Sequence, residues 1–206
     1  MKLYFSPGAC SLSPHIVAQE LGISLALEKV DRAKKLADGS DYWAVNPKGY
    51  VPALLLDNGE LLTEGPTIVQ YLADSRPDAK LAAPNGTLER YRLQEMLGYI
   101  NSEIHKAFSP LFYPTTPAET RQDRLDHLRK RYALLDKRLA DRPYLFGEQF
   151  TVADAYLFTV TSWAGHVKLD LSGFPNLMAF QARVAARPAV VSAMTAEGLL
   201  GAPAAK

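Results

Sequence analysis

The chain changes its secondary-structure pattern once along its length, and this change limits the possible folds more than any other feature. Up to about residue 76, short strand-like segments alternate with helical ones in the order β-α-β, a short irregular helix, then β-β-α. From about residue 87 onward, every periodic segment has helical spacing. The segments 76–78 and 83–86 are rich in Pro, Asn and Gly, as linkers are. We therefore predict an α/β domain over 1–77, followed by an all-helical domain over 87–206.

The strongest local signals set the elements of each part. Residues 57–59 read Asp-Asn-Gly between two apolar runs, which predicts a β-hairpin. In the second part, 152–163 is apolar nearly all round, which is typical of a helix at the centre of a bundle. Thr151 and Asp154 before it have the spacing of a capping box, so we assign Asp154 a structural role. The alanine-rich segment after Gly201 is expected to fray.

Composition excludes several classes of function. A net charge of +1 over 206 residues leaves no basic face for nucleic acid. No apolar run reaches the roughly 18 residues of a membrane span, and the N-terminus lacks a signal-peptide pattern. The four histidines lack metal-ligand spacing, and no glycine-rich phosphate loop is present, so neither a metal nor a nucleotide is expected. A single cysteine cannot form an internal disulfide, which favours the cytoplasm.

That single cysteine, Cys10, follows a strand-like segment and precedes a helix. Pro14 is tolerated only in the first helical turn, so the helix begins at or just after Ser11, a good N-cap residue. Backbone N–H groups at a helix start stabilise a thiolate, so we expect the pKa of Cys10 to lie below about 8.5. The alternative is a small buried hydrophobic residue, the usual fate of a free cysteine.

Two further segments of the first part suggest a binding site near Cys10. The Val51-Pro52 bond is a candidate cis peptide at a strand entrance, which leaves the Val51 backbone free to pair with an extended peptide. Pro66 suits the first helical position with Gly65 as N-cap, so backbone N–H groups there would bind an anion. Glu64 beside them can receive an ammonium group. Lys35 is a weaker candidate for holding another carboxylate, and ordinary loops with solvated side chains are the alternative for all of these.

The long helix predicted over 88–108 carries a polar stripe opposite its buried face. At about 100° per residue, Ser102, His105 and Lys106 fall on the side away from the apolar stripe. The stripe itself comprises Leu93, Met96, Leu97, Ile100, Ile104, Ala107, Phe108 and Leu111. The polar side is either solvated or lines a cleft against the first domain, with His105 near Cys10.

Taken together, these residues resemble the bacterial beta class of glutathione S-transferases. The resemblance covers essentially the whole chain, and its joint motifs are specific. They lie at 6–13, 41–42, 45–52, 62–66, 68–74, 102–106 and 150–158. The resemblance implies a thioredoxin-like glutathione-binding domain followed by a helical bundle that carries the second-substrate side of the cleft, assembled as a homodimer.

The resemblance also implies roles for individual residues. Glutathione is the co-substrate, and Cys10 meets its sulfur. The Val51 backbone pairs with the cysteinyl part, while Glu64 and Gly65 hold the γ-glutamyl end. Lys35, His105 and Lys106 approach the glycyl end and the catalytic cysteine, and Ser102 reaches the glutathione of the partner subunit. The remaining candidates, which would form the wall of the apolar second-substrate pocket, are Phe108, Phe112 and Trp163.

Two departures from the family pattern concern glutathione binding. Relatives often carry asparagine where this chain has Gly98, and tyrosine where it has Phe5. Tyr4 and Ser6 are alternative activating hydroxyls, but strand alternation sends Tyr4 into packing, so we favour Cys10.

We expect conjugation of glutathione to small hydrophobic electrophiles, with detoxification as its purpose. Thiol–disulfide transferase or peroxidase activity through Cys10 is a further expectation. A dithiol cycle is excluded, because Ser13 stands where a second cysteine is required. The alternative is a non-enzymatic glutathione-binding or regulatory protein on the same scaffold.

Overall fold

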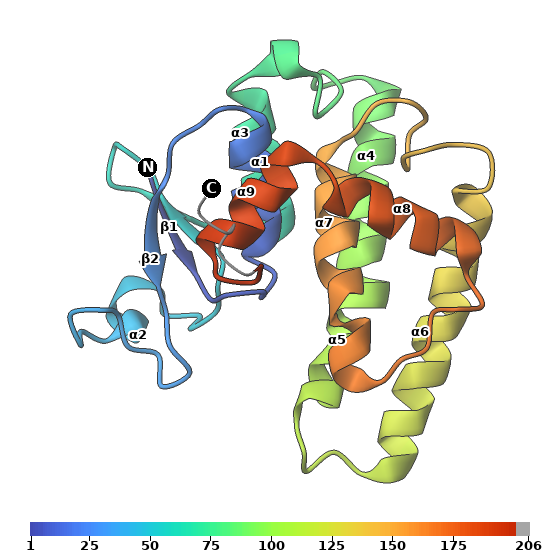
Figure 1. The fold of residues 1–206 in the computed structure, drawn as a ribbon. Helices are drawn as coiled ribbons and strands as arrows, with labels where there is room; N and C mark the ends of the chain where they lie inside the picture. Colours follow the sequence, from blue (N-terminus) through green and yellow to red (C-terminus); the bar gives the residue numbers. More distant parts are fainter. Residues whose placement is uncertain (201–206) are drawn as a thin grey trace, which may run out of the picture. The chain divides into compact units, whose positions relative to one another are not determined.

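The computed structural model describes residues 1–200, which form two compact units (Figure 1). The first unit comprises residues 1–79 together with the described segment from Ala186 onward, and the second comprises Lys80–Ala185. Residues 201–206, which include the alanine-rich segment expected to fray and the end of the predicted 87–206 domain, lie outside the described residues. Within residues 1–200, no helix has both the length and the apolar character needed to cross a membrane.

The first unit is built on a four-stranded sheet in the order β2-β1-β3-β4. Its strands are β1 (Lys2–Phe5), β2 (Ala26–Lys29), β3 (Ala53–Leu55) and β4 (Leu61–Thr63). Strand β1 pairs parallel with β2 and antiparallel with β3, and β3 pairs antiparallel with β4. The β3–β4 hairpin predicted at Asp57-Asn58-Gly59 is confirmed, and Gly59 adopts the left-handed conformation (φ +87°) that such a turn requires.

Three helices of the N-terminal part belong to this unit, namely α1 (Leu12–Glu20), α2 (Tyr42–Val45) and α3 (Gly65–Asp74). A 3₁₀ turn over Pro77–Ala79 follows α3. Tyr4 is buried in a cluster with Val30, Tyr42 and Ala53, so its predicted packing role is confirmed. Strand alternation sends its neighbours in β1 to the opposite face of the sheet.

The C-terminal helix α9 (Pro188–Ala196) packs on α1. The guanidinium of Arg187, just before α9, lies 2.6 Å from the Glu20 carboxylate at the end of α1. The two compact units therefore do not coincide with the predicted domains 1–77 and 87–206. The chain returns to the first unit after Ala185, so its C-terminal segment packs with the N-terminal part.

The second unit is built from helices, with an isolated β-bridge between Tyr144 and Gly147. Its helices are α4 (Leu88–Tyr99), η2 (Ile100–His105), α5 (Lys106–Phe108), η3 (Ser109–Phe112), α6 (Ala118–Arg138), α7 (Val152–Thr161), η4 (Ser162–Val167) and α8 (Pro175–Ala185). All ten residues of α7 are buried, and α7 contacts α4, η2 and α8. The predicted central helix of the bundle is therefore confirmed.

Asp154 occupies the N-terminus of α7 as the capping box predicts. Its Oδ2 accepts from the Thr151 backbone N–H at 2.8 Å and from the Thr151 hydroxyl at 2.7 Å. Its Oδ1 accepts from the Leu145 N–H at 2.8 Å, which ties the preceding loop to the helix. Burial raises the pKa of Asp154 to about 6, although these hydrogen bonds lower it.

The long helix predicted over 88–108 is continuous, but its middle is a π-helical segment, η2 (Ile100–His105). Within the predicted apolar stripe, every residue except the partly exposed Met96 is buried. Gly98, Ser102 and Lys106 are exposed on the other side, and His105 is partly buried. The periodicity therefore assigned the apolar stripe and the exposed residues Gly98, Ser102 and Lys106 correctly, whereas His105 is less exposed than its place on the polar side predicts. The π-helical segment was not predicted from the sequence. Such segments occur often at functional sites.

Candidate functional site

Cys10 lies in the loop between β1 and α1, where its Sγ donates a hydrogen bond to the carbonyl oxygen of Val51 at 3.1 Å. Helix α1 begins at Leu12 with Ser11 as N-cap, as predicted. However, the Ser11 hydroxyl does not cap the helix. It accepts from the Ser6 N–H and donates to the Ser6 carbonyl, both at 3.2 Å, which closes the loop that holds Cys10.

The pKa of Cys10 is raised to about 12, so the prediction of an acidified thiol is wrong. The largest cause is burial. Cys10 is partly exposed as a residue, but its sulfur is packed closely enough to lose hydration. Backbone N–H groups of Cys10 and Ser11 lower the pKa as predicted, while the negative charge of Glu64 raises it and the positive charge of Lys34 lowers it. Donation to Val51 further favours the neutral thiol, because a thiolate has no proton to donate.

The Val51–Pro52 peptide bond is cis, as predicted. The carbonyl of Tyr50, one residue earlier, accepts from the Tyr42 hydroxyl and from the Asn46 amide, both at 2.8 Å. Both donor residues are buried. They hold the backbone leading into Val51, and they were not recognised from the sequence.

Glu64 is the N-cap of α3, and Gly65 is its first residue, so the predicted helix start was one residue late. Glu64 adopts a positive φ of 70°, an uncommon conformation for a residue with a side chain. The Glu64 carboxylate pairs with the ammonium of Lys48 at 3.3 Å, and Lys48 also donates to the Thr63 hydroxyl at 2.8 Å. The carboxylate therefore receives an ammonium group from Lys48, a lysine that sequence reasoning missed.

Lys35 is exposed, and its ammonium lies 4.0 Å from the Asp41 carboxylate. The lysine whose charge acts on Cys10 is its neighbour Lys34. Lys34 has a left-handed backbone conformation (φ +63°), and its ammonium lies 6.0 Å from the centre of the Tyr50 ring.

A buried carboxylate from the end of the chain braces the Cys10 loop. Glu197, which follows α9, accepts from the Gly8 backbone N–H at 2.9 Å through Oε2. Its Oε1 lies 2.9 Å from Nδ1 of His15 on α1, and both side chains are almost completely buried. Gly8 and Glu197 are 189 residues apart, so no local pattern could have indicated this contact.

In the second unit, the imidazole of His105 is held by polar and aromatic neighbours. Its Nδ1 lies 2.6 Å from the hydroxyl of Tyr156, which donates to Oδ1 of Asn101 at 2.9 Å. The His105 ring also packs edge-on against Trp163, with 5.0 Å between ring centres. Trp163, Phe108 and Phe112 pack against one another, with ring centres 5.5–6.2 Å apart. The residues expected to form the apolar wall are thus gathered beside His105.

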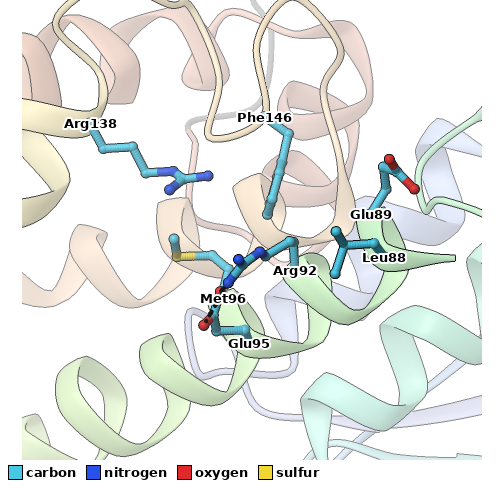
Figure 2. A pocket seen from close by; sticks show the side chains of 7 residues that line it. All are labelled: Leu88, Glu89, Arg92, Glu95, Met96, Arg138 and Phe146. Atoms are coloured by element: carbon cyan, nitrogen blue, oxygen red, sulfur yellow. Dashed lines mark hydrogen bonds and ion pairs between the residues drawn. The ribbon is translucent and has the colours of Figure 1, made fainter.

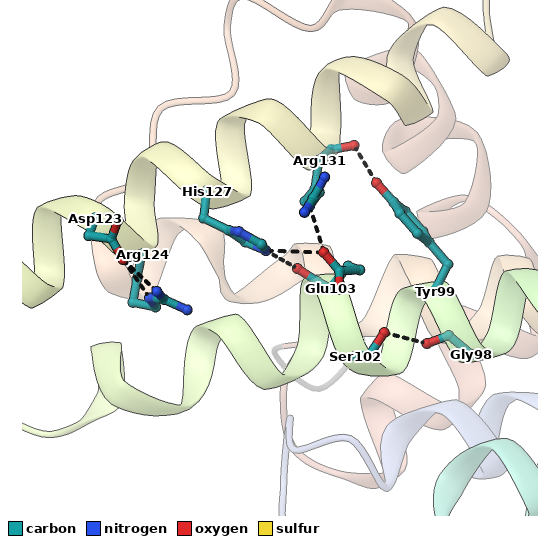
Figure 3. A network of polar contacts seen from close by, with 8 residues as sticks. All are labelled: Gly98, Tyr99, Ser102, Glu103, Asp123, Arg124, His127 and Arg131. Atoms are coloured by element: carbon teal, nitrogen blue, oxygen red, sulfur yellow. Dashed lines mark hydrogen bonds and ion pairs between the residues drawn. The ribbon is translucent and has the colours of Figure 1, made fainter.

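Ser102 and Lys106 are exposed on the same helical segment. The Ser102 hydroxyl donates to the Gly98 carbonyl at 3.0 Å, and Figure 3 shows this pair on the side of the helix away from α6. On the α6 side, the Glu103 carboxylate lies 2.7 Å from Nε of Arg131. Gly98 has open space around the position that a Cβ would take, so a side chain would fit there.

A pocket of about 350 Å³ opens elsewhere in the second unit (Figure 2). It is lined by Leu88, Glu89, Arg92, Glu95, Met96, Arg138 and Phe146. None of the predicted site residues is among them, so this pocket plays no part in the candidate site. Among residues 1–200, no cluster of His, Cys, Asp and Glu side chains has the arrangement of a metal site.

Comparisons with known proteins cover both units. Residues 8–75 match the family model for the glutathione S-transferase N-terminal domain, and residues 99–188 match that for the C-terminal domain. The chain is 52% identical to glutathione S-transferase GstA of Escherichia coli O157:H7, over 97% of this chain and 100% of the relative.

Two similar solved structures share the fold. One is the beta-class glutathione S-transferase of Sphingomonas chungbukensis, with 49% identity, a TM-score of 0.93 and coverage of 97% of this chain and 100% of that one. The other is a sphingomonad glutathione S-transferase complexed with glutathione, with 46% identity, a TM-score of 0.93 and the same coverage.

Proposed function

The chain belongs to the glutathione S-transferase family and is a bacterial enzyme of the beta class, and from this premise we propose how its residues bind and use glutathione. The tripeptide lies extended along the Val51 edge, with its sulfur against Cys10. The observation that carries this proposal is the 3.1 Å contact between the Cys10 Sγ and the Val51 carbonyl oxygen. A ligand whose cysteine pairs with the Val51 backbone, as an added strand does, brings its own thiol to the only protein thiol.

Polar groups around this edge complete the binding of the tripeptide. Glu64 receives the γ-glutamyl ammonium, and its contact with the Lys48 ammonium at 3.3 Å supports this, because the carboxylate is accessible to such a cation. Backbone N–H groups from Gly65 onward, at the start of α3, receive the γ-glutamyl carboxylate. Lys35 and Lys106 supply positive charge for the glycyl carboxylate.

The enzyme acts as a homodimer in which Ser102 reaches the glutathione of the partner subunit. Leu88 and Tyr91, one turn apart on α4, are 66% and 60% exposed, which supports an apolar contact surface between subunits. A cytoplasmic location fits an enzyme that depends on one reduced cysteine and on a thiol co-substrate.

For conjugation, the glutathione thiolate attacks an electrophilic carbon. A carbon–sulfur bond forms, and a leaving group such as halide departs with the bonding electron pair. Phe108, Phe112 and Trp163 form an apolar wall suited to small hydrophobic electrophiles, consistent with detoxification. His105 donates a proton or stabilises the thiolate electrostatically. The nucleophile of this reaction is the glutathione sulfur, so the step does not require Cys10 to ionise.

Cys10 instead serves a monothiol redox reaction. Its sulfur, once deprotonated, attacks the glutathionyl sulfur of a mixed disulfide. The Cys10–glutathione S–S bond forms, the original S–S bond breaks, and the other sulfur leaves as a thiolate that is then protonated. A second glutathione then attacks the Cys10–glutathione disulfide, which releases oxidised glutathione and restores the Cys10 thiol. Reduction of hydroperoxides by glutathione through the same residue is the peroxidase variant of this reaction.

Substitution of Cys10 separates the two reactions. Cys10→Ala and the near-isosteric Cys10→Ser are assayed for conjugation with chlorodinitrobenzene and for reduction of a glutathione mixed disulfide. Conjugation is expected to persist within about tenfold in both variants, while disulfide reduction is lost, because neither variant can form the mixed disulfide. A variant that keeps disulfide reduction, or fails to bind immobilised glutathione although it is folded, contradicts the proposed site.

A further inference from the structure

We propose that Tyr156 and Asn101 are positioning residues that hold neutral His105 as its Nδ1–H tautomer, so that Nε2 is the atom that exchanges a proton with a thiol. The inference rests on the proposed function, which brings a sulfur to His105, and it adds acceptance of a thiol proton to the proton donation proposed there for His105. It concerns groups that lie entirely within the second unit: Asn101 and His105 on η2, and Tyr156 on α7.

The direction of the hydrogen bonds follows from the number of protons available. A tyrosine hydroxyl has one proton to donate. The Tyr156 hydroxyl donates it to Oδ1 of Asn101 at 2.9 Å. The 2.6 Å contact between the same hydroxyl and Nδ1 of His105 therefore requires the proton of His105 to lie on Nδ1. In a neutral imidazole the lone pair is then on Nε2.

The surroundings keep this arrangement in place. Tyr156 is only 1% exposed, so water cannot readily replace either partner of its hydroxyl. The His105 ring packs edge-on against both Tyr156 and Trp163, at 5.8 and 5.0 Å between ring centres. Rotation of the imidazole that would exchange its two nitrogens would have to break these contacts and the hydrogen bond together.

The π-helical segment η2 sets how Asn101 and His105 are placed relative to the Tyr156 hydroxyl. Asn101 and His105 are four residues apart in η2. Both contact the hydroxyl of Tyr156, which belongs to the facing helix α7. The two side chains belong to one π-helical segment, so their spacing relative to Tyr156 is set by its backbone. This gives the π-helical segment a specific role in orienting the candidate catalytic side chain.

The chemical consequence is a defined path for one proton. A thiol proton moves from sulfur to Nε2, the electron pair stays on sulfur, and His105 becomes an imidazolium with protons on both nitrogens. In the reverse direction the imidazolium returns the Nε2 proton to a leaving thiolate. The opposite tautomer would present an N–H toward the thiol and could not accept its proton.

The test is ¹⁵N NMR of histidine-labelled full-length protein, at a pH well above the ordinary histidine pKa of about 6.5. The His105 signals are assigned by their loss in His105→Gln. Wild type is expected to show a protonated Nδ1 and an unprotonated Nε2. Asn101→Asp is expected to keep this pattern, because a carboxylate also accepts from Tyr156. Tyr156→Phe is expected to mix the two tautomers.

Enzyme kinetics supply the second readout. Tyr156→Phe is expected to lower the high-pH plateau of kcat for disulfide reduction on the order of tenfold. Tyr99→Phe is the matched control, because it removes a hydroxyl from the neighbouring turn that donates to the Arg131 carbonyl at 3.2 Å rather than to His105 or Asn101. It should leave the tautomer unchanged.

A protonated Nε2 in wild type, or a tautomer change in Asn101→Asp, overturns the inference, since either result means that Asn101 donates to Tyr156. An unchanged tautomer in Tyr156→Phe overturns it as well. These outcomes are distinct from failure of the proposed function, which would appear as undiminished activity of His105→Gln in both assays.

Discussion

Replacement of Glu197 by alanine should destabilise the first unit strongly, although Glu197 is far from Cys10 in the sequence. The carboxylate accepts from the Gly8 N–H and contacts Nδ1 of His15, each at 2.9 Å. Both side chains of the Glu197–His15 pair are at most 2% exposed, so water cannot replace the lost acceptor. Removing one member of a buried ionic or hydrogen-bonded pair costs about 3–5 kcal/mol.

The expected loss is a large fraction of the roughly 5–15 kcal/mol that stabilises a typical domain. At about 2–4 °C per kcal/mol for a chain of this size, Tm should fall by roughly 6–20 °C. Glu197→Gln keeps one acceptor oxygen, so it should lose only about 1–2 kcal/mol. The assay is denaturant unfolding followed by circular dichroism, with thermal unfolding as a second measure.

Ser192→Ala is the matched control, because the Ser192 hydroxyl contacts Gln19 on the exposed side of the same α1–α9 pair. It should change the free energy of unfolding by no more than about 0.5 kcal/mol. If Glu197→Ala unfolds at the same denaturant concentration as Ser192→Ala, the reasoning from burial is refuted. A double-mutant cycle with His15→Ala should also give a coupling energy of about 1 kcal/mol or more.

Three further predictions concern charge and assembly. Burial raises the pKa of Asp154 from 3.8 to about 6, so the folded state binds more protons than the unfolded state between these values. The contribution of Asp154 to the free energy of unfolding should therefore fall as the pH rises from about 4 to about 6. Unfolding of Asp154→Asn compared with wild type at each pH should show this slope, and parallel curves would contradict it. The raised pKa of Cys10, about 12, predicts slow alkylation by iodoacetamide in the ligand-free protein, with a rate that still climbs above pH 8.5; a rate that levels off near neutral pH would disprove it. Tyr91→Glu should weaken the proposed homodimer, detected as a lower mass by light scattering, whereas a Leu88→Met control should keep the wild-type mass.

Local signals in the sequence accounted for most secondary structure and for the capping of α7. The hairpin turn at 57–59 and the capping box of Thr151 and Asp154 depend on residues within a few positions of one another, so their hydrogen bonds can be inferred from spacing alone. The cis Val51–Pro52 bond was predicted for the same reason. The two faces of the long helix followed from its periodicity.

The ionisation of Cys10 could not be derived in this way. The sequence correctly indicated that backbone N–H groups at the start of α1 lower its pKa. The net direction of the pKa shift also depends on how closely other groups enclose the sulfur and on the charge of Glu64, 54 residues away, both of which raise the pKa. Only the tertiary structure shows that burial outweighs the N–H groups.

The sequence by itself therefore determined the order of strands and helices, the family, and which segments carry the candidate site, because these depend on short-range spacing and on motifs. The tertiary structure alone decided the partners of those residues: Val51 for Cys10, Lys48 for Glu64, Tyr156 for His105 and Glu197 for the Cys10 loop. Such contacts join residues up to 189 positions apart. Their energies depend on burial and distance, which packing sets and which no local pattern encodes.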